Sequence, residues 1–180
     1  MLEYNGAAYF GWQRQKNQPT VQEALEQALQ KTTGTVPPLV VAGRTDRGVH
    51  ALAQVANFHT HSRINDWQFA FALNYHLPHD ITVHRSKEVD SQFNARLNSL
   101  SKRYRYRIYQ GPHIPALERN RCWFIHSTLD QKAMLRAAEL MIGEHDFNAF
   151  RSIECDAEHA IRHMIDISIQ VHSRPPIGEY

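Results

Sequence analysis

The sequence contains little cysteine. Its two cysteines among 180 residues, Cys122 and Cys155, are far apart and have no C-x-x-C spacing. This excludes a disulfide framework and a zinc site built on cysteine pairs, and it predicts a reduced, cytoplasmic location with two structural thiols. Apolar runs of the roughly 20 residues needed to cross a bilayer are absent. The first residues also lack the charged-then-apolar pattern of a signal peptide.

Several sequence motifs that indicate a particular chemistry are absent as well. The sequence has no phosphate-binding P-loop, no dinucleotide glycine pattern and no nucleophile elbow around a serine or cysteine. Hydrophobic residues make up 42% of the chain and charged residues 21%, which is typical of a globular protein with a buried core.

Acidic residues are absent from one long stretch, Ser91 to Leu117. The net charge of the chain is only +2, but this stretch concentrates cations among tyrosines: Arg96, Lys102, Arg103, Arg105 and Arg107. A basic stripe interleaved with aromatic residues is typical of a nucleic-acid surface. A solvated strand face is the alternative that the pattern leaves open.

Histidine is plentiful, with 12 residues, and it raises the alternative of a metal site. His59 and His61 would share one face of a strand, and His76, His79 and His84 lie close together in sequence. None of them forms the i, i+4 helical pair of a zinc protease, and no cysteine pair supports a structural zinc. We therefore predict no metal site and keep a histidine-based metal hydrolase as a rival hypothesis.

The hydrophobic pattern of the first half predicts strand–helix–strand–strand–helix–strand, the split βαβ arrangement of ferredoxin-like domains. A capping box at Thr20–Glu23 begins the first helix, with the Glu23 side chain reaching back to Thr20, and Gly34 ends it. Polar Gln54 in the third strand predicts partial exposure. Asp66 is expected to cap the second helix, which would direct Trp67, Ala70, Phe71 and Leu73 toward the core. The strands are expected at residues 2–4, 36–42, 52–58 and 81–89.

A second unit is predicted to begin near Leu100. Alternation across Arg103–Tyr109 predicts a strand with tyrosines on one face and arginines on the other. A helix is expected at residues 130–142 and a long strand at 161–171, followed by a turn at Ser173–Gly178. Because such a turn normally leads into a returning strand, we expect this unit to be incomplete in the sequence.

The loop Gly43–His50 connects two predicted strands and contains Arg44, Asp46 and Arg47. By itself, Gly-Arg-Thr-Asp-Arg-Gly favours a structural turn with a local Asp–Arg pair. The flanking cations nevertheless favour an ionised Asp46. A carboxylate fixed on a stiff loop is suited to nucleophilic attack or proton abstraction.

These residues, together with others in the same order along the chain, resemble the tRNA pseudouridine synthase A family. The resemblance covers about nine tenths of the sequence, and the ordered set is far more specific than any single motif. It is carried by Tyr4–Gly6, Tyr9–Gln15, Thr20–Glu23, Ala42–Ala51, Gln92–Arg96, Lys102–Tyr106, Gly143–Phe147 and Phe150–Arg151.

The resemblance implies a pseudouridine synthase fold: two ferredoxin-like subdomains around a cleft, residues 1–97 with the catalytic loop 42–51, and residues 98–180, the second incomplete. It implies that Asp46 is the catalytic carboxylate, that Tyr104 stacks on the target uracil and that Arg44 holds the flipped uridine. Its partner would be tRNA, which it would modify on the 3′ side of the anticodon stem-loop (tRNA positions 38–40). The enzyme would act as a homodimer and would need no cofactor or metal. RNA-binding roles fall to Arg96, Lys102, Arg103 and Arg105.

One departure from the family pattern follows from the end of the sequence. The family continues through a further strand and a helix whose arginine pairs with the catalytic aspartate, and that arginine has no counterpart here. We therefore expect weak activity or none from these residues, and a non-catalytic RNA-binding fragment is the alternative function.

Overall fold

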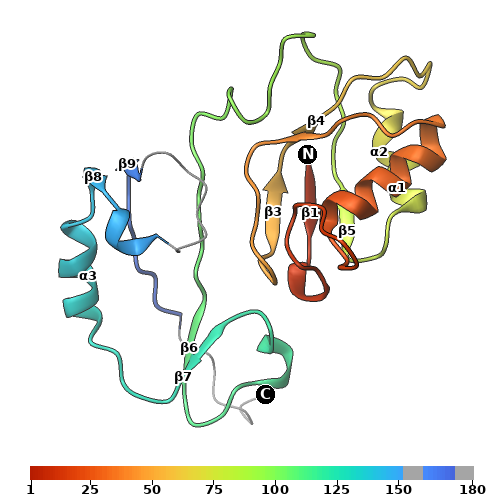
Figure 1. Ribbon diagram of the computed structural model, residues 1–180. Helices are drawn as coiled ribbons and strands as arrows, with labels where there is room; N and C mark the ends of the chain where they lie inside the picture. The colour runs from red at the N-terminus through yellow and green to blue at the C-terminus, as the bar shows by residue number, and fades with distance from the viewer. Residues whose placement is uncertain (152–159, 173–180) are drawn as a thin grey trace. The chain divides into compact units, whose positions relative to one another are not determined.

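A computed structural model describes residues 1–151 and 160–172 of the chain. These residues separate into two compact units: Met1–Arg107 with Leu117–Cys122, and Ile108–Ala116 with the residues from Trp123 onward. Both units contain helices and strands (Figure 1), as predicted. The boundary between residues 97 and 98 stays a prediction. The predicted turn at Ser173–Gly178 and Cys155 lie outside the described residues.

The first unit is built on an antiparallel sheet in the order β3-β1-β5. Strand β1 lies in the middle, where Leu2 pairs with Gln54 on one side and with Val83 on the other. A shorter antiparallel pair, β2 and β4, continues after β3, from which β4 is separated only by Val55. The bounds are β1 Leu2–Tyr4, β2 Val40–Val41, β3 Ala51–Gln54, β4 Ala56–Asn57 and β5 Ile81–Val83.

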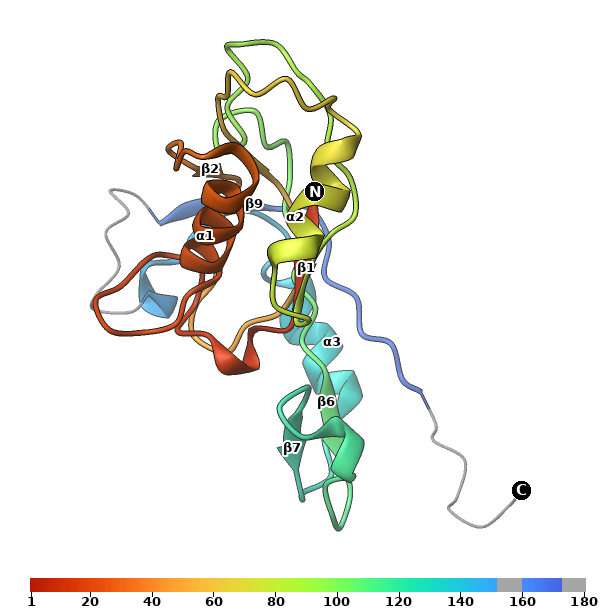
Figure 2. The same ribbon diagram turned by 90° about the vertical axis from the view of Figure 1, so that its right-hand side faces the viewer.

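Two helices, α1 (Val21–Thr33) and α2 (Gln68–His76), lie on the same side of this sheet (Figures 1 and 2). Their apolar stripes and the inward side chains of β1 and β5 form a single hydrophobic core. Its most deeply buried members include Trp12, Val21 and Leu29, each no more than 1% exposed. The site-bearing unit therefore has a closely packed base.

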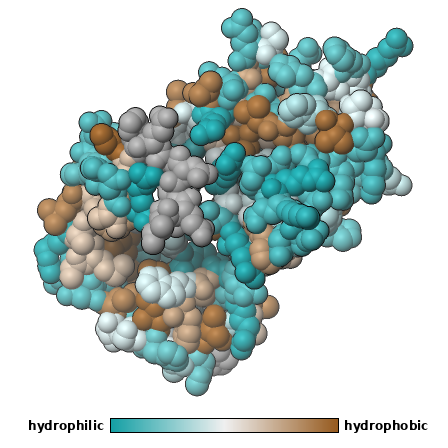
Figure 3. All heavy atoms as spheres, in the orientation of Figure 1, coloured by the Kyte–Doolittle hydropathy of each residue, from teal (hydrophilic) through white to brown (hydrophobic). Residues whose placement is uncertain are grey.

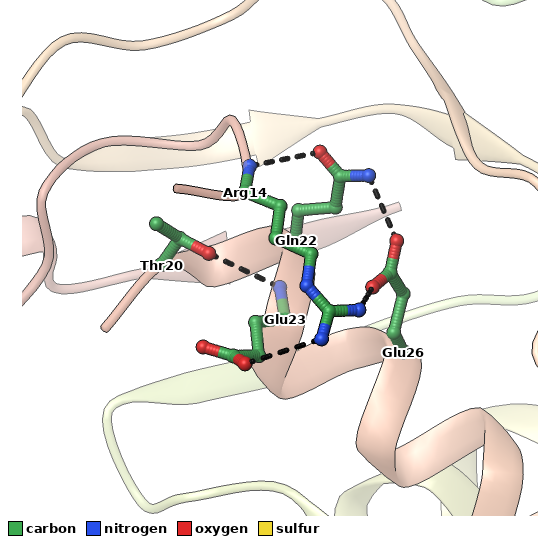
Figure 4. A network of polar contacts seen from close by, with 5 residues as sticks. All are labelled: Arg14, Thr20, Gln22, Glu23 and Glu26. Atoms are coloured by element: carbon green, nitrogen blue, oxygen red, sulfur yellow. Dashed lines mark hydrogen bonds and ion pairs between the residues drawn. The ribbon is translucent and has the colours of Figure 1, made fainter. Parts of the chain in front are cut away.

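Helix α1 begins and ends as predicted, except at one contact. The Thr20 hydroxyl accepts a hydrogen bond from the Glu23 amide at 3.3 Å, and Gly34 ends the helix at a φ of +76°. The Glu23 carboxylate does not reach back as a capping box requires. It lies 3.5 Å from Arg14, which also pairs with Glu26 at 2.8 Å (Figure 4). The nearby guanidinium is the stronger partner for a carboxylate, so this part of the prediction was wrong.

The core-facing side of α2 also differs from the prediction. Trp67 and Phe71 are 57% and 71% exposed, whereas Phe69, Ala70 and Leu73 are buried. Residues four apart share a helix face, so burial of positions 69, 70 and 73 turns positions 67 and 71 outward. Asp66 accepts from the Trp67 amide at 2.7 Å but does not cap the helix by bonding deeper into its first turn.

The second unit contains two small sheets and one helix, α3. Strand β6 pairs with β7 in parallel, and β8 pairs with β9 antiparallel, with Gly143 opposite Met164. Helix α3 begins close to its predicted start, where Asp130 caps it by accepting from the Ala133 amide at 3.0 Å. The bounds are β6 Ile108–Gln110, β7 Trp123–Ile125, α3 Gln131–Glu139, β8 Gly143–Asp146 and β9 Ile161–Met164.

Regular structure in the second half is shorter than predicted. Residues 101–107 form no strand, and Tyr104 and Tyr106 are 74% and 87% exposed. Strand β9 ends at Met164, so the predicted strand over 161–171 is only partly present. Strands form where a neighbour supplies hydrogen bonds, and alternation alone does not provide that neighbour. Short 3-10 turns at Gly6–Ala8, Ala116–Glu118 and Asn148–Phe150 complete the regular structure of the described part.

Candidate active site

The loop between β2 and β3 presents Asp46 to solvent. Its turn is closed by a hydrogen bond from the Val49 amide to the Asp46 carbonyl at 3.2 Å. Gly48 follows within this turn with a φ of +78°, a conformation that favours glycine. The backbone of Asp46 is thus fixed while its side chain is exposed. This combination suits a carboxylate that acts on a bound substrate.

A buried polar group braces the N-terminal half of this loop. The Gln54 side chain donates to the Gly43 carbonyl at 2.8 Å and to the Tyr4 hydroxyl at 3.3 Å. The Tyr4 hydroxyl in turn lies 2.9 Å from the Thr45 hydroxyl. The Thr45 carbonyl accepts from the Trp12 amide at 2.9 Å. Residue 45, directly before Asp46, is therefore held by both its side chain and its backbone.

The segment 5–12 braces the other half of the loop through close backbone contact. The Gly48 amide donates to the Tyr9 carbonyl at 3.2 Å. A Cβ atom added at Gly6 would lie 2.0 Å from the Val49 carbonyl oxygen, and one at Gly11 would lie 2.5 Å from that of Thr45. Only glycine allows the two backbones to approach this closely.

His50 connects the end of the loop to two other segments of the first unit. The Gly6 amide donates to His50 Nδ1 at 3.2 Å, and His50 Nε2 lies 2.8 Å from the Asn120 carbonyl. An N–H donor facing Nδ1 requires the ring proton to be on Nε2, from which it is donated to the carbonyl. The neutral Nε2–H tautomer satisfies both contacts.

The bracing segment is itself attached to α1. The carbonyls of Gly11 and Trp12 accept from the first helical amides, Val21 at 3.2 Å and Gln22 at 3.0 Å. These amides have no partner within the helix, so the segment satisfies donors that α1 leaves open. The Gln22 side chain accepts from the Arg14 amide and donates to Glu26, which adds a side-chain link (Figure 4).

The arginines beside Asp46 do not pair with it. The Arg47 guanidinium lies over the Phe10 ring, 4.2 Å from its centroid, in a cation–π contact. Arg44 is exposed, and within residues 1–151 and 160–172 neither arginine forms an ion pair with Asp46. The expected local Asp–Arg pair is thus wrong: aromatic contact holds one cation, and the other faces water.

The basic stretch approaches the loop at one residue. The Lys102 side chain lies against Gly43, its Nζ 3.1 Å from where a Cβ would be. Upstream, Asn57 accepts from the Ala95 amide at 2.8 Å and so fixes the backbone next to Arg96. The remaining predicted RNA-binding and stacking residues are solvent-exposed: Arg96, Arg103, Tyr104 and Arg105. In the described part of the chain, no hydrogen bond, ion pair or ring contact joins Asp46, Arg44 and Tyr104.

The bracing residues Tyr4, Gln54 and His50 were missed as site residues. Gln54, predicted to be partly exposed, is 9% exposed. A polar residue in a buried strand next to a candidate loop is the signal that points to it, because a buried amide needs partners.

Other kinds of site find little support in the described residues. Across residues 1–151 and 160–172, no group of three or more His, Cys, Asp or Glu side chains is arranged to hold a metal ion. No helix in the same ranges has the length and apolar character needed to span a bilayer.

Fold and site together define a class: a mixed helix-and-strand protein that presents one carboxylate on a braced loop, with exposed cations around it. A family model described as tRNA pseudouridine synthase matches residues 1–98 and 137–177. The chain belongs to the tRNA pseudouridine synthase family.

Curated relatives agree with this assignment. The chain is 46% identical to tRNA pseudouridine synthase A of Acetivibrio thermocellus over 170 residues. This alignment covers 94% of the chain and 70% of the relative. The chain is 46% identical over 161 residues to the protein of the same name from Caldicellulosiruptor bescii, covering 89% and 66%. With that of Photorhabdus laumondii it shares 40% over 168 residues, covering 93% and 64%. The chain thus spans about two thirds of the length of these relatives.

Proposed function

We propose that this chain isomerises uridine to pseudouridine in tRNA, with Asp46 as the catalytic carboxylate. The observation that carries the proposal is the braced loop: a fixed backbone and an exposed carboxylate, within the region that the family model matches. In the reaction the C1′–N1 bond breaks, the uracil turns, and a C1′–C5 bond forms; C5 loses its proton and the freed N1 gains one, so that the product is an isomer of uridine. Asp46 would attack C1′ or remove the C2′ proton.

Binding of the target would require the uridine to leave its helix, at a cost of about a few kcal/mol. Tyr104 would return about 1–3 kcal/mol by stacking on the uracil. Arg44, exposed two residues before Asp46, would hold the flipped nucleotide. Lys102, Arg96, Arg103 and Arg105 would contact the phosphates, and the location of Lys102 against Gly43 supports this role most directly. The target would lie on the 3′ side of the anticodon stem-loop.

For the fold we propose the split βαβ arrangement in residues 1–97, with the second subdomain in residues 98–180. The antiparallel order β5-β1-β3 supports this arrangement. So does the pairing of β2 with β4, the strand that directly follows β3. Both helices also lie on one face of the sheet (Figure 2). We also propose that the protein acts as a homodimer in the cytoplasm.

The test is pseudouridine formation in an unmodified tRNA transcript. The chain should form pseudouridine slowly, and Asp46→Asn should lower that rate by about 10³-fold or more while retaining salt-sensitive tRNA binding. Asp90→Asn, outside the loop, is the matched control. Equal turnover by the chain and by Asp46→Asn would overturn the role of Asp46.

The second candidate is a non-catalytic RNA-binding protein. It is favoured by the observation that no cation pairs with Asp46 within the described residues. This alternative expects tRNA binding that weakens with salt, no pseudouridine with any transcript, and no effect of Asp46→Asn. The same assay therefore separates the two candidates.

A further inference from the structure

The buried amide of Gln54 has a fixed orientation. Its Nε2 faces the Gly43 carbonyl, which can only accept, so that atom must be the nitrogen. The second hydrogen of the same nitrogen is directed to the Tyr4 hydroxyl, and Oε1 accepts from the Val55 amide at 3.2 Å. Every hydrogen-bonding group of the side chain facing the loop is thereby used.

This orientation directs the next hydrogen bond. The Tyr4 hydroxyl oxygen accepts from Gln54, so the arrangement that uses every group has the Tyr4 O–H donating to Thr45 Oγ1 at 2.9 Å. The Tyr4 side chain itself cannot shift easily. It is 3% exposed and packs against Trp12 with ring centroids 6.2 Å apart.

The backbone of Thr45, the residue that accepts this hydrogen bond, is also held. The carbonyl of Thr45 is held by the amide of Trp12, which is 1% exposed. A residue fixed at both backbone and side chain sets the starting direction of the next residue, Asp46. Rotation of Thr45 would therefore carry the carboxylate away from its position.

We propose that Tyr4 is a positioning residue for Asp46, acting through Thr45 and oriented by Gln54. The inference rests on the proposed function, because it assigns Tyr4 a part in that reaction. A Tyr4 that served only the core would act through its ring, which phenylalanine retains. A positioning Tyr4 acts through its hydroxyl, which phenylalanine lacks.

The experiment compares Tyr4→Phe, Thr45→Val and the double variant. Each single change should slow the single-turnover rate of pseudouridine formation by about two- to tenfold, the effect of one lost hydrogen bond, with tRNA affinity unchanged. The double variant should be no slower than the slower single variant, because both remove the same bond. Tyr109→Phe, which removes a half-buried hydroxyl in the second unit, should leave the rate unchanged.

Amide hydrogen exchange of residues 44–49 supplies a readout that needs no turnover. Exchange there should be about two- to tenfold faster in Tyr4→Phe and in Thr45→Val, and unchanged in Tyr109→Phe. If no variant or parent forms pseudouridine, the proposed function fails while exchange still decides the positioning role. Unchanged rate and exchange in Thr45→Val would overturn the proposal, as would equal loss of rate and tRNA affinity in Tyr4→Phe.

Discussion

The two units of this chain have similar apolar patterns in their helices, but they bury these apolar side chains to different extents. In the first, the stripes of α1 and α2 meet the sheet, and Leu29 is fully buried. In the second, α3 has a strong apolar stripe, yet Leu135 within it is 43% exposed, and Leu140 just after the helix is 79% exposed. Hydrophobic side chains lie at the surface of the part around α3 (Figure 3). The buried apolar residues in its described part are Ala138 and Ala160.

This difference shows that amphipathic patterning and burial are separate properties. A periodic stripe specifies which side of a helix is apolar, but stabilisation comes only from surface removed from water. The first unit also holds the Asp46 loop, whose bracing contacts all come from residues of that unit. The candidate catalytic carboxylate is thus attached to the part of the chain that has a core.

The largest expected effect is from a matched pair of leucine truncations. Leu29→Ala should lower the free energy of unfolding by about 2–5 kcal/mol, because it leaves a cavity in the core. Leu140→Ala should change it by no more than about 0.5 kcal/mol, because that side chain is already in water. Urea unfolding followed by circular dichroism measures both. Similar costs at the two positions would break the comparison between the units.

A smaller effect is expected where the loop meets its bracing segment. Gly11 has a φ of +89°, and its Cβ would lie 2.5 Å from the Thr45 carbonyl oxygen. Gly11→Ala should therefore cost about 2–3 kcal/mol from combined backbone strain and crowding, and it should also slow pseudouridine formation.

Gly34→Ala is the control for this change. Gly34 has a similar φ, +76°, with no atom within 4 Å of an added Cβ. It should cost about 1 kcal/mol from conformation alone and leave the rate unchanged. Equal unfolding free energies for the two variants would mean that the loop moves away from Gly11 at no cost.

Removing a helix cap in each unit should cost about 1 kcal/mol of stability, and the two variants compare the units. Thr20→Ala removes the cap of α1 and should lower the main unfolding transition by about that amount. Asp130→Ala removes the same kind of cap from α3, but its cost should appear as local fraying and faster amide exchange in α3. Equal shifts of the main transition would show that both helices unfold together.

The sequence predicted those parts of the fold that depend on neighbouring residues. The caps at Thr20 and Gly34 are present because each needs only contacts within a helical turn. The loop around Asp46 was also located correctly between two strands. These features require no knowledge of what packs against them.

What escaped prediction depends on residues far apart in the chain. Gln54 is buried because Tyr4, 50 residues away, and Gly43 satisfy its amide. Glu23 turned to Arg14 because the segment 9–15 folds back over the start of α1. The roles of Asp46, Arg44 and Tyr104 stay predictions, since polar contacts within the described residues do not join them. Sequence periodicity reports only the spacing of nearby residues, so it cannot predict partners that lie far apart in the chain.

The last expected effect depends on pH and concerns Tyr9. Burial raises the pKa of its phenol above the ordinary 10.0, and the hydrogen bond to Asp80 and that carboxylate's charge act in the same direction. The Tyr9 hydroxyl donates to Asp80 at 2.6 Å, a bond of about 1 kcal/mol that needs the protonated phenol.

Because the folded pKa is higher than the unfolded one, folding favours the protonated form, and this contribution is fully present below pH 10. It is lost as the pH rises through the folded pKa, so the chain should lose stability above pH 10. Tyr9→Phe should be less stable at pH 8 by about 1 kcal/mol, and the difference from the parent should shrink above pH 10. A pH-independent difference for Tyr9→Phe would mean that the phenol contributes by packing rather than through its proton, and the first unit would then owe its stability to apolar contacts alone at this position.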